Sequence, residues 1–127
     1  VVKTVWVEMP WQKGLSANHA YYTSQWTRCR RLRPTVLVWR DCLTVVLRTE
    51  LTRLGLTPTP PVLVTVVQHT PRKTDADNIL KVPMDAVKDA LGIDDRHFSA
   101  DGSRWVRTPL AEAHYLVGVS WEEGEET

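Results

Sequence analysis

The segment 62–92, VLVTVVQHTPRKTDADNILKVPMDAVKDALG, decides the fold of this chain. Val62 to Val67 form a nearly continuous apolar run rich in β-branched residues, which is typical of a central strand covered on both faces. The basic loop Pro71-Arg72-Lys73 follows, and apolar residues then recur at helical spacing until Gly92, a residue suited to end a helix. Pro83 falls in the first turns of this helix and predicts a late start or a kink. The segment therefore predicts a strand, a basic loop and a helix in succession.

Outward from this segment, strands and helices alternate along the chain. Val1 to Glu8 alternates in polarity and predicts a strand, whereas residues 10–34 lack periodicity and predict a long functional or mobile loop. A helix is predicted from Thr35, as its N-cap, to Leu54, with Gly55 after its last turn. Two more strands are predicted near His97 to Arg107, with a bulge at Asp101-Gly102, and at Ala113 to Trp121.

These elements predict the fold class, a single α/β domain over residues 1–127 with a mixed β-sheet, two main helices and an acidic tail at about 122–127. A hydrophobic content of 43% and a charged content of 24% are ordinary for a soluble globular protein. We find no apolar run long enough to span a membrane and no signal region, so we expect a cytoplasmic protein without a membrane partner. Cys29 and Cys42 have no zinc-ligand spacing and predict neither a zinc site nor a disulfide framework.

The net charge of +1 conceals two oppositely charged halves. Residues 1–73 carry 11 Lys/Arg against 3 Asp/Glu, and residues 74–127 carry 5 against 12. A basic half can hold a polyanion while an acidic half holds a metal ion. The acidic tail accounts for four of the twelve acidic residues, so it explains only part of the excess.

Carboxylates gather on either side of the predicted second helix. Asp75 and Asp77 precede it, the doublet Asp94-Asp95 follows it, and Lys81 lies within its first turns. Mg²⁺ prefers oxygen ligands, and two or three carboxylates from separate segments suit it, whereas the same carboxylates without a cation would repel one another. This cluster predicts a magnesium site that acts on a phosphate, with Lys81 near the phosphate.

Each of these residues also has an ordinary structural interpretation. Asp77 or Asn78 can cap the helix, Lys81 can pair with Asp85 at i,i+4, and Asp94-Asp95 can form a polar turn. The metal-site hypothesis rests on all three features occurring together at suitable spacing after a strand.

Several motifs together resemble the signature of RusA-like crossover junction endodeoxyribonucleases. The specific part is Asp75-Ala76-Asp77-Asn78-Ile79-Leu80-Lys81, then Met84-Asp85-Ala86, then a glycine and Asp94-Asp95. Met9-Pro10-Trp11 and Trp39-Arg40-Asp41 are similar to the family's opening segment and first helix. Thr74 departs from the pattern, because an arginine is common there, and so does His97-Phe98 after the doublet.

The resemblance implies a small α/β homodimer that binds four-way (Holliday) DNA junctions and cuts them with Mg²⁺, or with Mn²⁺ as a substitute. It implies that Asp75, Asp77 and Asp95 bind the metal, that Asp94 participates, and that Lys81 is an essential cation. A four-way junction has approximate two-fold symmetry, so a symmetric pair of subunits suits two opposed cuts.

Basic residues in two segments are candidate DNA contacts, namely Arg28, Arg30, Arg31, Arg33, Arg72 and Lys73. The first four follow Tyr21, Tyr22 and Trp26, a mixture that can track a DNA backbone and stack on unpaired bases. Solvated arginines on a mobile loop are an equally good interpretation. Rival motifs fit poorly: an EF-hand is excluded by Ile79 and Leu80, and no Gly-rich phosphate loop predicts a nucleotide cofactor. The alternative function is a non-catalytic nucleic-acid-binding protein that keeps the fold.

Overall fold

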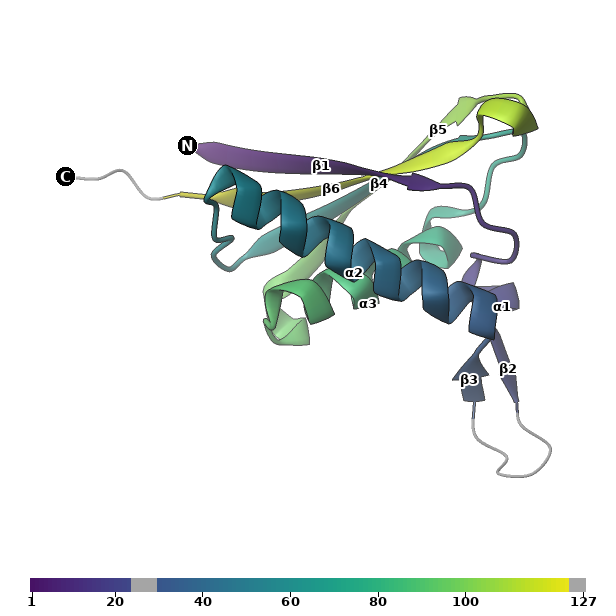
Figure 1. Cartoon of the computed structure of the whole chain (residues 1–127), viewed down its shortest axis with the longest axis horizontal. Coiled ribbons are helices and arrows are strands. Elements are labelled where there is room, and N and C mark those ends of the chain that lie inside the picture. The colour runs from purple at the N-terminus through teal and green to yellow at the C-terminus, as the bar shows by residue number, and fades with distance from the viewer. Residues whose placement is uncertain (24–29, 124–127) are drawn as a thin grey trace.

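The computed structural model describes residues 1–23 and 30–123 (Figure 1). Within these ranges, the side chains of Ala17, Asn18, Ala76, Asp77, Asp95 and Asp101 lie outside the description. The strands are β1 (Val2–Pro10), β2 (Tyr21–Thr23), β3 (Arg30–Leu32), β4 (Val62–Thr70), β5 (Phe98–Arg107) and β6 (His114–Glu122). The helices are α1 (Ala17–Ala20), α2 (Pro34–Leu54) and α3 (Ala76–Leu91), with short 3-10 turns at Asp95–His97 and Leu110–Glu112.

Four strands form one mixed sheet in the order β1-β6-β4-β5. β4 and β5 are parallel and are joined through α3, whereas β6 is antiparallel to both β1 and β4. The pairing of β4 with β5 shifts at Val64, where Asp101 is an extra residue in β5, so the predicted bulge is confirmed. The predicted fold class, an α/β arrangement with a mixed sheet and two main helices, is confirmed.

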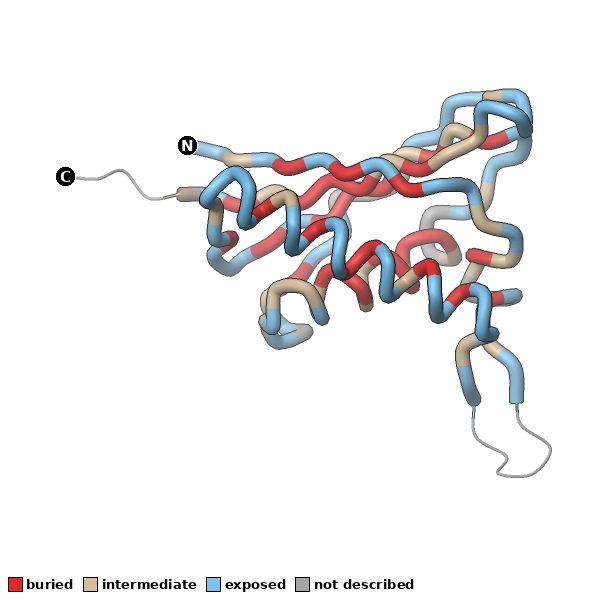
Figure 2. Tube along the Cα trace, in the orientation of Figure 1, coloured by how far each residue is buried: buried red, intermediate tan, exposed pale blue. Residues whose placement is uncertain are grey.

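The hydrophobic core lies between one face of the sheet and the two long helices (Figures 1 and 2). Val5, Val119 and Val64 lie side by side across three strands and are all buried on this face. Tyr115, Val117 and Trp121 of β6 are buried there too, so the apolar face of the last strand belongs to the core.

The second face of the sheet is open, and the prediction that the central strand is covered on both faces is wrong. Alternate residues of a strand point to opposite faces, and those of β4 that face away from the helices include Leu63, which is 39% exposed. Trp6 of β1 crosses this face over Gly118 of β6. A continuous apolar run therefore did not distinguish a strand with one covered face from one with two.

The long helices begin at residues different from those predicted. Arg33 is the N-cap of α2 and Pro34 takes the first helical position, which suits a residue without an N–H, so Thr35 lies inside the first turn. α3 begins at Ala76 and continues through Pro83, so the expected late start is wrong. Gly55 and Gly92 end the two helices in the left-handed conformation, at φ 66° and 63°, as predicted.

Residues 10–23 and 30–34, which belong to the predicted long loop, contain regular structure. They include α1 and a two-stranded hairpin in which Tyr21 pairs with Leu32 and Thr23 with Arg30. The Arg33 N–H donates to the Ala20 carbonyl at 2.7 Å, which closes the base of the hairpin. Strands of three residues are too short to show a polarity pattern, so neither strand was predicted. In the described part of the chain, no helix is long and apolar enough to cross a membrane.

Candidate functional site

The loop between β4 and α3 is fixed by the buried side chain of Gln68. Its Nε2 donates to the Thr74 carbonyl at 2.8 Å and to Ser103 Oγ at 3.0 Å, and its Oε1 accepts from the Thr74 N–H at 3.1 Å. Gln68 is 1% exposed, so these bonds replace water that cannot reach the amide. Gln68 thereby sets where the chain leaves the sheet and where Asp75 enters α3.

The same loop is tied at its other end through Thr70. The Thr70 hydroxyl donates to the Arg72 carbonyl at 2.6 Å, and the Thr70 carbonyl accepts from the Trp105 indole at 3.1 Å. These bonds leave Arg72 and Lys73 exposed on a short loop whose backbone is held at both ends. A fixed backbone lowers the entropy lost when such side chains bind an anion.

A second loop, residues 11–16, faces the first across a cavity of about 480 Å³. The Trp39 indole donates to the Pro10 carbonyl at 2.8 Å, and the Tyr115 hydroxyl donates to the Gln12 carbonyl at 3.4 Å. Burial raises the pKa of Tyr115 to about 12, so its phenol stays protonated at neutral pH. The cavity therefore lies between two loops that are anchored separately to the core.

The rim of this cavity is positively charged. Lys13 comes from the first loop, and Arg72 and Lys73 come from the second. In the ranges 1–23 and 30–123, none of these three cations has a carboxylate partner among the described side chains, and no Asp or Glu lines the cavity. Unpaired cations facing a concave surface concentrate potential that attracts anions.

Asp75 lies beside this rim, as the N-cap of α3. Its carboxylate is exposed and makes no capping hydrogen bond, and among the described residues it has no ion-pair partner. Asp77 and Asn78, the alternative capping residues, lie inside the helix. The side chain of Asp77 is outside the description, so the structure places only its backbone, two residues beyond Asp75. The exposed carboxylate of Asp75 is therefore open to a metal ion.

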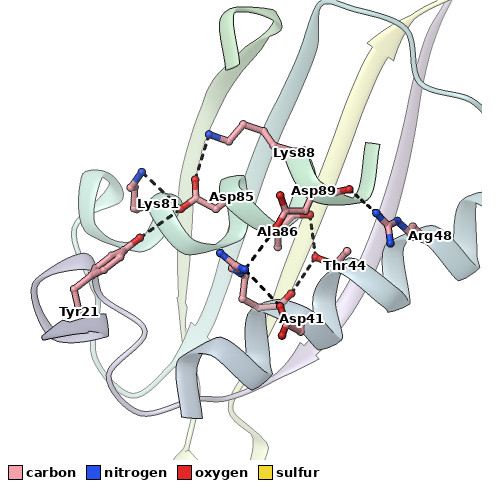
Figure 3. Close-up of polar contacts among 10 residues, drawn as sticks. Tyr21, Asp41, Thr44, Arg48, Lys81, Asp85, Ala86, Lys88 and Asp89 are labelled. Carbon is pink, nitrogen blue, oxygen red and sulfur yellow. Dashed lines mark hydrogen bonds and ion pairs between the residues drawn. The ribbon is translucent and has the colours of Figure 1, made fainter. Parts of the chain in front are cut away.

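Lys81 forms the ion pair that the structural interpretation expected. Its Nζ lies 3.6 Å from Asp85 Oδ2, and Lys88 Nζ lies 3.2 Å from the other oxygen of the same carboxylate (Figure 3). The Lys81 side chain is 54% exposed, so the pairing does not remove it from solvent or from a phosphate. Asp85 therefore orients Lys81 without burying it.

Tyr21 connects the hairpin to this group. Its hydroxyl donates to Asp85 Oδ2 at 3.4 Å, and the guanidinium of Arg30 lies 4.4 Å from the centre of its ring. Burial, and then the negative charge of Asp85, raise the pKa of Tyr21. Sequence reasoning anticipated the pairing of Asp85 with Lys81 from their i,i+4 spacing, but it missed the contacts of Tyr21 and Gln68.

The predicted DNA contacts fall in two places. Arg30 and Arg31 are exposed on the hairpin, and Arg33 at its base donates from Nε to the His19 carbonyl at 2.8 Å. Arg72 and Lys73 lie at the cavity instead. Arg28 lies outside the described residues.

The two pairs of acidic residues lie at opposite ends of α3. Asp75 follows the end of β4, whereas Asp94 and Asp95 precede Phe98, which pairs with Val62 at the start of β4. The 16 residues of α3 separate the two pairs by about 24 Å at the usual helical rise. Within one chain, therefore, the structure does not bring Asp94 to Asp75. Asp94 Oδ2 instead lies 3.6 Å from Arg96 Nε.

A fit to Mg²⁺ can be judged only at the Asp75 end. Among the described side chains, no three His, Cys, Asp or Glu residues converge on one point, and Asp77 and Asp95 are outside that set. An exposed carboxylate without a partner, with a second aspartate two residues on, suits an ion that takes one or two carboxylates and completes its shell with water and phosphate. The exposed carboxylate of Asp75 therefore suits Mg²⁺, and Asp94, at the other end of α3, does not join it within one chain.

Comparison with known proteins finds no protein-family model that matches this chain and no match among the curated proteins.

Proposed function

We propose that this protein is a Mg²⁺-dependent, structure-selective endonuclease that hydrolyses phosphodiester bonds at four-way DNA junctions, the activity that its RusA-like motifs imply. The observation that supports this most is the exposed carboxylate of Asp75 beside a cationic rim, both without an ion-pair partner among the described side chains. Cations hold the backbone of a polyanion, and a free carboxylate next to them can hold the ion that hydrolysis needs.

The residues of the chain have separate roles in this proposal. Lys13, Arg72 and Lys73 bind backbone phosphates. Asp75 and Asp77 hold Mg²⁺, which when bound supplies charge neutralisation and a water of lowered pKa. Lys81, about one helical turn beyond Asp77 and oriented by Asp85, places its ammonium group against the developing charge of the phosphoryl oxygens.

The position of the second acidic pair extends the proposal to a homodimer. Asp94 and Asp95 lie about 24 Å from Asp75 along α3, so they can reach a metal held there only from another chain. A two-fold axis exchanges the same surfaces between two copies, so it would supply Asp94 and Asp95 of the partner subunit to both sites at once. Two sites in a symmetric pair match the two opposed cuts that resolve a junction.

Cleavage of a synthetic four-way junction tests the proposal. Wild type should cut with Mg²⁺ or Mn²⁺ and not with EDTA, and Asp75→Asn or Asp77→Asn should reduce cutting by about a hundredfold or more while junction binding persists. Asp41→Asn, on the exposed side of α2, is the matched control and should cut like wild type. Wild-type cleavage by Asp75→Asn would reject the metal site.

The alternative is a nucleic-acid-binding protein without catalysis. It is favoured by the exposed arginines of the hairpin and the cationic rim of the cavity, which need no metal to bind DNA. Tight binding of the junction without cutting, with every divalent ion tried, would support this alternative.

A further inference from the structure

We infer that the cavity between residues 11–16 and residues 70–74 binds one unpaired nucleotide of DNA, with the base against its apolar wall and the phosphate at its basic rim. The inference rests on the proposed function, because it assigns part of the same DNA substrate. It adds a base-binding site next to the position proposed for the cut.

The wall of the cavity has the chemistry that a nucleobase needs. Apolar and aromatic side chains from four segments line it, namely Trp11, Leu15, Ile79, Leu110 and Tyr115. Trp11 is 38% exposed, so part of a large aromatic surface is open to a ligand. Aromatic side chains bind unstacked bases through their faces with little preference for sequence, and a cavity of about 480 Å³ is of ligand-binding size.

The rim supplies the complementary charge. Lys13 approaches from one side of the cavity, and Arg72 and Lys73 approach from the other. The protonated phenol of Tyr115 brings no negative charge into the wall. An apolar wall with a cationic rim matches a nucleotide, which has an apolar face and an anionic phosphate on opposite sides of its sugar.

The cavity also lies in the right place for an unpaired nucleotide. Ile79 lines the cavity from the first turn of α3, and its N–H donates to the Asp75 carbonyl at 3.0 Å. This hydrogen bond places the cavity wall next to Asp75. A base stacked inside a duplex cannot enter a concave cavity, whereas a base at a branch point leaves its stack at lower cost. Occupation of the cavity would therefore favour cutting near a branch.

Photocrosslinking in EDTA tests this inference without requiring cleavage. The probes are a four-way junction and a short single strand, each with one 5-iododeoxyuridine. In the junction this nucleotide is placed at the branch point. The crosslinked peptide is identified by mass spectrometry. We expect the crosslink to form at Trp11. The unlabelled single strand should compete with the probe and reduce crosslinking, whereas a blunt duplex or inorganic phosphate should not. A crosslink that maps outside the cavity, or equal competition by duplex, would overturn the inference.

A variant that fills the cavity supplies the second readout. Leu110 is 60% exposed at the cavity, so Leu110→Trp should fill its mouth without disturbing the core, and Leu54→Trp at the far end of α2 is the matched control. We expect Leu110→Trp to weaken single-strand binding about tenfold and to abolish the Trp11 crosslink, with melting temperature unchanged. Wild-type binding and crosslinking by Leu110→Trp would reject the cavity as the site. Failure of wild type to cut the junction with Mg²⁺ would instead count against the endonuclease and leave these binding results intact.

Discussion

At the scale of single residues, one buried amide positions the loop that carries much of the candidate site. Gln68 belongs to β4, a strand rich in valine, and its side chain turns inward to bind both backbone groups of Thr74. A polar residue in an apolar strand indicates a buried hydrogen-bond network, but the sequence does not say which partner it has. The position of Asp75 therefore depends on a contact that only the three-dimensional structure shows.

Replacing Gln68 should affect both stability and activity. Gln68→Leu leaves the partly buried N–H and carbonyl of Thr74 without their partner, which should lower the free energy of unfolding by about 2 kcal/mol. Because Arg72, Lys73 and Asp75 flank Thr74, junction binding and cutting should fall as well. Urea denaturation and the cleavage assay measure the two effects.

The control for this variant lies in the same network. Ser103→Ala removes only the bond from Gln68 Nε2 to Ser103 Oγ and keeps both bonds to Thr74. The free energy of unfolding of Ser103→Ala should fall by about 1 kcal/mol, and the variant should cut the junction at the wild-type rate. If both variants behaved alike, the loop would not depend on Gln68.

At the level of strands and helices, cross-strand contacts partly cover the open face of the sheet, and that of Trp6 is among them. Trp6 of β1 lies opposite Gly118 of β6, and a Cβ atom at Gly118 would come within 2.7 Å of the Trp6 ring. The absence of a side chain at residue 118 thus lets the indole lie flat on the neighbouring strand. Such cross-strand pairs are the local unit of sheet stability.

A double-mutant cycle should reveal this contact. Gly118→Ala forces the Trp6 ring away from the strand and should lower the free energy of unfolding by about 1–2 kcal/mol. In a Trp6→Ala background the added methyl group meets no ring, so the same substitution should cost almost nothing. Thermal unfolding of the four proteins measures the coupling. Equal costs in both backgrounds would show that the ring does not contact Gly118.

The elements that could be predicted from sequence are those with long patterns. The strands at both ends of the chain, β4, the two long helices, their terminal glycines and the bulge at Asp101 all follow from polarity and turn residues. The hairpin of β2 and β3 was missed because strands of three residues carry no periodicity. The open face of the sheet was missed because a valine-rich strand looks the same whether one or both of its faces are covered.

Sequence reasoning named Asp75, Arg72 and Lys73, which lie at or beside the cavity, but it did not name Lys13 and did not predict the separation of the acidic pairs. Sequence proximity suggested that Asp75 and Asp94 would converge, yet a helix that joins parallel strands has its two ends at opposite ends of the strands. The cavity was unpredictable because it is assembled from loops about 60 residues apart. Its residues carry no shared motif.

At the scale of the whole molecule, the separation of the two acidic pairs leads to a test of subunit composition. If each metal site combines Asp75 of one chain with Asp95 of the other, Asp75→Asn and Asp95→Asn homodimers are both inactive. A heterodimer of the two variants then has one site with both defects and one site with none. Mixing the inactive proteins under conditions that exchange subunits should therefore restore about a quarter of the wild-type nicking sites.

A site built within one chain gives the opposite result. Each chain of the heterodimer would then carry one defect, both sites would be inactive, and mixing would restore nothing. Co-refolding of two differently tagged variants and nicking of a four-way junction with Mg²⁺ would measure the outcome. Heterodimers purified through both tags should have about half of the wild-type nicking sites. Mixing Asp75→Asn with Asp77→Asn is the matched control, because both residues belong to the same end of α3. Under the shared-site arrangement each site of this heterodimer carries one defect, so the two variants should not restore activity. Recovery in the first mixture alone would show that the partner subunit supplies the second acidic pair.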